Sequence, residues 1–254
     1  MRLAPTSLLR RERAVVLLAL AGLTALAWLY LLVAQRDMAM PMAPMDDMPD
    51  MAMPFPAGWV LAMWWIMMLG MMLPSAAPMI LTFEALQRRK RERHEVYVPT
   101  AIFVAGYLLV WGGFSLVATA AQWWLQQNAL LSPMLALATP PLGGALFVMA
   151  GLYQWSPLKS ACLRQCRSPF AFLLAQWRDG WSGALRMGAG HGAYCLGCCW
   201  VLMALLFAVG VMSLLWVAAI AAFVFAEKLL PHGIWIARLG GIAMATFGVW
   251  LAAS

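Results

Sequence analysis

Long runs of apolar residues dominate this chain and limit what it can fold into. Apolar residues make up 64% of its 254 positions and charged residues 11%, against about 25% charged in an average soluble domain. A helix needs about 20 consecutive apolar residues to cross a bilayer. Because the runs are continuously apolar rather than alternating, they favour helices over strands. The sequence predicts an all-α protein, a polytopic bundle of transmembrane helices.

The apolar runs predict about seven spans, at residues 14–34, 58–81, 98–121, 134–155, 194–209, 213–230 and 234–252. The basic stretch "RRER" precedes the first run, as in a signal peptide. The run is longer than the apolar region of a signal peptide, however, and the following "AQRDMAM" is a poor cleavage site. We therefore expect a retained span, with six spans as the alternative if it is cleaved. Residues 169–187 mix polar and aromatic side chains and predict an amphipathic helix at the interface.

The basic residues fix the expected orientation. With the N-terminus in the cytoplasm, every lysine and arginine except Arg36 falls in a cytoplasmic segment or at its edge, as the positive-inside rule requires. This predicts a multi-pass protein of the bacterial inner (cytoplasmic) membrane. In a membrane protein, basic residues mark the cytoplasmic loops, which accounts for the net charge of +7. We therefore expect no nucleic acid as a partner. The absence of a P-loop motif argues against an ATP-driven pump, and we expect no nucleotide or organic cofactor.

The expected organisation has three parts: a basic N-terminus with the first span (1–34), a periplasmic loop rich in Met, Pro and Asp (35–57), and a membrane domain (58–254) with a cysteine-containing cytoplasmic loop at 156–193. Proline keeps the periplasmic loop extended, so its methionines stay accessible. Thioether sulfur is a soft donor that suits Cu(I) and does not form disulfides. We predict copper capture by Met38, Met40, Met42, Met45, Met48, Met51 and Met53; a low-complexity linker is the alternative.

Methionines continue into the second span. Met63, Met67 and Met71 recur at helical spacing, with Met68 and Met72 in a neighbouring stripe. This pattern predicts a thioether ladder along which Cu(I) passes. The alternative is core packing, to which the flexible methionine side chain is well suited.

All five cysteines lie on the predicted cytoplasmic side, where structural disulfides are disfavoured. In "HGAYCLGCCW", at the expected mouth of the fifth span, His191, Cys195, Cys198 and Cys199 share one helix face. Cys162 and Cys166, four residues apart, share another. Nearby basic residues (Lys159, Arg164 and Arg167) are expected to favour thiolate. The cluster predicts a soft-metal site, with redox-active thiols or simple packing as alternatives.

The blocks "MWWIMMLGMMLPSAAPM", "YQWSPLKSACLRQCRSPF", "MGAGHGAYCLGCCWVLMALLFAVGVMSLLW" and "EKLLPHG" carry a resemblance. Over residues 58–250 the chain resembles a bacterial family of predicted metal-binding integral membrane proteins, a domain of unknown function whose members are copper-chaperone-like. The resemblance implies copper handling.

The sequence thus predicts an inner-membrane protein that captures Cu(I) outside and binds or transfers it through the ladder and the thiol cluster. We expect metal ion and lipid as partners, together with a copper donor or acceptor protein or a larger membrane complex. A non-enzymatic role is expected. The alternatives are an accessory subunit or assembly factor of a larger complex, and a membrane thiol oxidoreductase.

Overall fold

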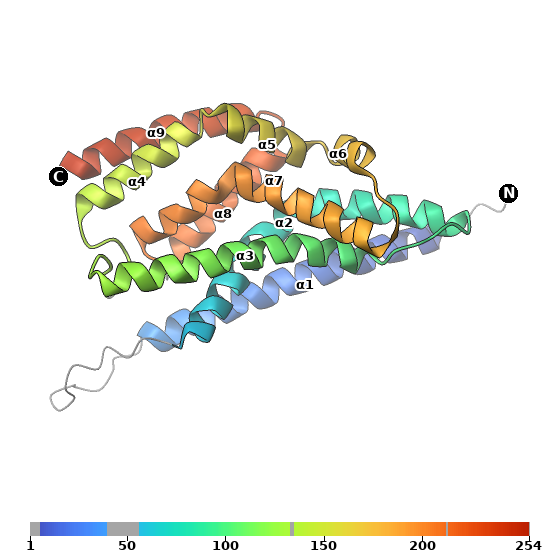
Figure 1. The fold of residues 1–254 in the computed structure, drawn as a ribbon, viewed down its shortest axis with the longest axis horizontal. Helices are drawn as coiled ribbons and strands as arrows, with labels where there is room; N and C mark the ends of the chain where they lie inside the picture. Colours follow the sequence, from blue (N-terminus) through green and yellow to red (C-terminus); the bar gives the residue numbers. More distant parts are fainter. Residues whose placement is uncertain (1–5, 40–55, 133–134, 212, 254) are drawn as a thin grey trace.

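The computed structural model describes residues 6–39, 56–132, 135–211 and 213–253, and within them the chain is helical with no β-strand (Figure 1). The predicted all-α class is confirmed. The helices are α1 (Thr6–Ala39), α2 (Ala57–Glu92), α3 (Thr100–Gln127), α4 (Pro140–Tyr153), α5 (Pro157–Arg167), α6 (Pro169–Gln176), α7 (Gly180–Val209), α8 (Leu214–Leu229) and α9 (Gly233–Ala253).

Among the described residues, five helices are long and apolar enough to cross a membrane: α1, α2, α3, α7 and α9. They correspond to the first, second, third, fifth and seventh predicted spans. The fourth and sixth predicted spans are the shorter apolar helices α4 and α8, of 14 and 16 residues. Helix α4 starts later than expected because Pro140 and Pro141 occupy its first turn. Proline is tolerated in the first turn of a helix, but a helix does not continue through it to earlier residues.

Helix α7 begins 14 residues before the predicted start of the fifth span, at Gly180 rather than residue 194. The predicted interfacial helix over residues 169–187 is therefore divided between α6 and the first turns of α7. The division falls near Gly180, whose φ of 80° suits glycine. The glycine-rich start of α7 stays helical because it packs against α3: a Cβ atom at Gly188 would clash with the carbonyl oxygen of Phe103.

Two helix pairs, α3 with α7 and α4 with α9, form the closest packing in the bundle. In the second pair, a Cβ at Gly151 would lie 2.5 Å from the carbonyl oxygen of Gly241, and one at Gly144 equally close to that of Gly248. Glycine at these crossings lets the backbones approach, as in other membrane helix pairs.

Several basic segments lie together at one end of the bundle. In Figure 1, α1, α3 and α7 run in one direction and α2 runs against them. The start of α1, the basic end of α2 and the start of α7 thus lie together, while the C-terminus lies at the other end. This is the charge separation that the orientation argument requires; the membrane side itself remains a prediction.

Helix α2 is the core helix of the bundle, and its methionines are buried. Pro74 has no N–H to donate to the carbonyl of Gly70, and the indole of Trp28 in α1 takes that place at 3.3 Å. Nearer the start of α2, the indole of Trp64 donates a hydrogen bond to the side-chain oxygen of Gln122 in α3 at 2.8 Å. These bonds fix α2 between α1 and α3.

Candidate functional site

The histidine and cysteines of α7 lie on one buried face in the middle of the helix. His191, Cys195, Cys198 and Cys199 expose 2% or less of their surface. Cys195 is 15 residues beyond Gly180, about 22 Å along the axis. The expectation that these thiols lie at the start of the helix is therefore wrong, because α7 begins earlier than the apolar pattern indicated.

Helix α5 brings the other two cysteines to the same place. Helix α5 packs against α7, and its Cys166 is partly buried. Cys162 lies against Gly197, where a Cβ atom would be 2.8 Å from the Cys162 sulfur. All five cysteines are free thiols. Cys162 of α5 thus packs against α7 at Gly197, where the missing side chain provides the space.

One methionine of α2 reaches this thiol cluster, defined as Cys162, Cys166, Cys195, Cys198 and Cys199. The Sδ atom of Met72 lies 3.9 Å from the Sγ of Cys199. On the same helix Met63, Met67, Met68 and Met71 are buried as well, each with 2% exposure or less. A row of buried methionines thus runs through the core of the bundle, and Met72 at its far end lies against Cys199.

Polar groups that the sequence analysis did not assign to the site surround Cys195. The ammonium of Lys228 in α8 lies 2.9 Å from the Cys195 sulfur and 3.2 Å from the hydroxyl of Ser75 in α2. The hydroxyl of Tyr107 in α3 lies 3.1 Å from the same sulfur. Lys228 is only 6% exposed. A lysine near the end of an apolar run was the available signal, since charges inside membrane segments are costly and usually functional.

The basic residues of α5 do not act on the thiols as expected. Lys159 forms a buried ion pair with Glu227 of α8, with 2.8 and 2.9 Å between its Nζ and the two carboxylate oxygens. Arg167 donates to the backbone carbonyls of Glu227 and Pro231. Burial raises the pKa of the Cys162 thiol, so the predicted shift towards thiolate is wrong there. These contacts instead hold α5 against the end of α8.

His191 has no hydrogen-bond partner for either ring nitrogen among the described residues, although both are buried. Its ring is enclosed by Tyr107, Phe103 and Phe172, with centroid separations of 5.5, 6.3 and 5.7 Å. A buried polar atom without a partner is costly. This residue therefore requires an explanation beyond packing.

The predicted capture loop falls almost wholly outside the described part of the chain. Met38 lies in the last turn of α1 rather than in a loop. Met40, Met42, Met45, Met48, Met51 and Met53 lie outside the described residues.

No three His, Cys, Asp or Glu side chains within the described ranges are arranged to hold a metal ion. The thioether of Met72 belongs to none of those residue types. The site therefore consists of sulfur atoms that lie close together, one buried histidine without hydrogen bonds, and one buried ammonium, rather than a closed three-ligand centre.

Comparison with known proteins identifies one family. A family model described as PpoB2, copper chaperone, matches residues 61–251. That range includes the thiol cluster and the methionines of α2. No curated protein and no solved structure matches the chain.

Proposed function

The chain belongs to the PpoB2 copper chaperone family, and we propose that it binds Cu(I) inside the membrane through the sulfur atoms of α7, α5 and α2. Copper is the cargo in this proposal rather than a resident cofactor. The single observation that carries it is the meeting of Met72 with the thiol cluster at Cys199.

The spacing of these sulfur atoms suits a soft ion. With a metal–sulfur bond of about 2.3 Å, two sulfurs at trigonal angles are about 4.0 Å apart and two in a line about 4.6 Å. The Met72 and Cys199 sulfurs are 3.9 Å apart. Thiolate and thioether donors select Cu(I), which accepts low coordination numbers. A thiol–thioether pair, completed by a small rotation of Cys195 or Cys198, therefore supplies enough ligands.

Lys228 supplies the charge that such a site needs. Thiolate is the ligand form of cysteine, and a buried thiolate requires a nearby cation. The ammonium of Lys228 lies 2.9 Å from the Cys195 sulfur and meets this requirement. His191, four residues before Cys195, offers an imidazole nitrogen that has no protein partner and adds a donor at the same face.

The proposed route follows from the arrangement of the methionines. The segment containing Met40–Met53 precedes α2 in the sequence, and the buried methionines of α2 lead from Met63 to Met72. We infer that Cu(I) is captured by the methionines of this segment, passes along this row and is received by the thiol cluster, or travels the reverse way. The inner membrane of a bacterium is the compartment that the charge distribution favours.

The test is competition for Cu(I) against a chelator under anaerobic conditions, using the detergent-purified protein. We expect tight stoichiometric binding by the wild type, and its loss when Cys195, Cys198 and Cys199 are changed to serine. Deletion of residues 40–53 is expected to slow loading without reducing the final stoichiometry. A wild type that retains no more copper than a variant lacking all cysteines would overturn the proposal.

A further inference from the structure

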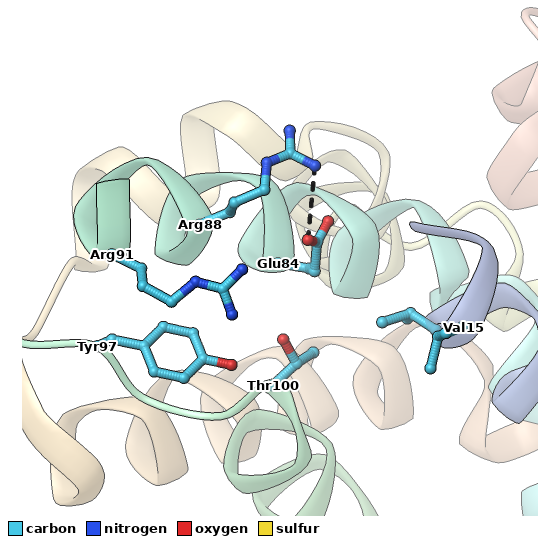
Figure 2. Close-up of a pocket in the computed structure, with 7 residues that line it drawn as sticks. Val15, Glu84, Arg88, Arg91, Tyr97 and Thr100 are labelled. Carbon is cyan, nitrogen blue, oxygen red and sulfur yellow. Dashed lines mark ion pairs between the residues drawn. The ribbon is translucent and has the colours of Figure 1, made fainter. Parts of the chain in front are cut away.

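Lys228 differs from the other buried charged side chains in what it contacts. The buried carboxylate and ammonium groups of the described residues are those of Glu84, Lys159, Glu227 and Lys228. Glu84 forms an ion pair with Arg88 in the pocket at the basic end of the bundle (Figure 2). Glu227 forms one with Lys159. The ammonium of Lys228 lies instead against a hydroxyl and a sulfur. Burying a charge inside a membrane protein is costly, so its place beside a sulfur calls for an explanation.

Three helices fix this ammonium on the sulfur of Cys195. The hydroxyl of Ser75 in α2 donates to the carbonyl oxygen of Met72 at 2.9 Å, which leaves its oxygen to accept from Lys228 of α8 at 3.2 Å. The hydroxyl of Tyr107 in α3 donates to the same carbonyl at 3.2 Å and lies 3.1 Å from the Cys195 sulfur. The ammonium is thereby held 2.9 Å from that sulfur.

A metal bound by Cys195 lies close to this ammonium. Metal–sulfur bonds are about 2.3 Å long and the ammonium is 2.9 Å from the same sulfur, so the metal and the ammonium are at most about 5 Å apart. At an effective dielectric constant of about 20, repulsion over this distance weakens binding on the order of a hundred-fold for each positive charge on the metal. A divalent ion carries that penalty twice.

The charge balance of the site favours the same ion. Thiolates bind Zn²⁺ as well as Cu(I), so the sulfur atoms alone do not exclude zinc. Two thiolates, one Cu(I) and the Lys228 ammonium sum to zero, whereas Zn²⁺ in place of Cu(I) leaves one buried positive charge. A third thiolate would cancel that charge only by adding another buried anion.

Given the copper site of the proposed function, on which this inference rests, we propose that Lys228 is a specificity-determining residue. Its ammonium makes the site accept a monovalent soft cation and reject divalent ones. Lys228 thus selects by charge, whereas the sulfur atoms select by softness.

The experiment compares the affinities of the full chain in detergent for Cu(I) and for Zn²⁺, each measured anaerobically against a competing chelator. Lys228→Met removes the charge and should lower the ratio of the Cu(I) affinity to the Zn²⁺ affinity roughly ten- to a hundred-fold. Lys228→Gln keeps a polar end beside Ser75 and should do the same, which preserves the test if the methionine variant does not fold. Lys228→Arg keeps the charge and should keep the preference. The matched control Arg164→Met removes a positive charge from the exposed side of α5 and should keep it as well.

The ratio of the two affinities distinguishes selection by charge from a structural role. Loss of packing weakens the binding of both ions alike, whereas removal of a repelling charge favours the divalent ion. Cu(I) binding with an unchanged or raised ratio in the neutral variants of Lys228, or with an equal fall in Arg164→Met, would overturn this inference and leave the copper proposal standing. A wild type that binds no Cu(I) would overturn the copper proposal and this inference with it.

Discussion

The buried ion pair between Lys159 and Glu227 gives the most quantitative prediction for the fold. Each side chain is 1% exposed, and the lysine contacts both carboxylate oxygens. Changing Lys159 to methionine keeps the volume of the side chain but leaves the Glu227 carboxylate buried without its cation. Removing one partner of a buried pair costs about 3–5 kcal/mol.

The pair connects α5, which carries Cys162 and Cys166, to α8, which carries Lys228, so its loss should also disturb the thiol cluster. For a chain of this size the cost corresponds to a fall in Tm of roughly 6–20 °C, measurable by thermal unfolding in detergent. The double variant Lys159→Met/Glu227→Leu should recover most of the loss, since an apolar pair is often as stable as a buried ionic one.

The control for this prediction is Arg164→Met, on the exposed side of the same helix, where we expect a change within about 0.5 kcal/mol. If the Lys159 variant melts like the wild type, the pair is not buried as described. If the double variant is no more stable than the single one, the penalty does not come from an uncompensated charge. Either result would refute the reasoning.

Three further predictions concern the site and its supports. Met72→Leu should weaken Cu(I) binding roughly ten-fold or more in chelator competition, whereas Met79→Leu, equally buried on α2, should not. Gly188→Ala should destabilise the bundle by about 1–3 kcal/mol in detergent unfolding, because its methyl group meets backbone of α3 that has no room to move; unchanged stability would contradict the close packing. The hydrogen bond from Lys90 lowers the pKa of the Asp179 carboxyl. The stability that this exposed pair contributes is therefore present above the ordinary carboxyl pKa of about 3.9. It is lost as the pH falls through the lowered pKa of Asp179. Lys90→Gln should remove this loss of stability at low pH, measured as the Tm at a series of pH values. If the loss persists in the variant, it comes from other carboxylates.

The fold class and most of the helices were predictable because membrane helices leave a strong apolar signal. The boundaries of α7 were not. Its first turns are rich in glycine and polar residues, which read as an interfacial segment. Packing against α3 stabilises them as helix, at a surface near Phe103 that leaves room only for Gly188. Such a tertiary contact leaves no periodic mark in one sequence.

The candidate site was predictable in its sulfur residues and not in its polar surroundings. Helical spacing placed Cys195, Cys198 and Cys199 on one face, and that needed no tertiary information. The contact between Met72 and Cys199 joins residues 127 positions apart, and the spacing along one helix does not encode it. Lys228 stands near the end of a predicted span, and sequence alone does not show that its ammonium lies against Ser75 and Cys195 inside the bundle.

The most direct test of the copper proposal is X-ray absorption of the protein loaded with Cu(I), which reports the atoms bound to the metal. The account predicts a shell dominated by sulfur at about 2.3 Å. That shell should lose sulfur both in Met72→Leu and in the variant with Cys195, Cys198 and Cys199 changed to serine. A shell of nitrogen and oxygen atoms, or a sulfur shell that neither variant changes, would contradict the claim that α7 and α2 hold copper together.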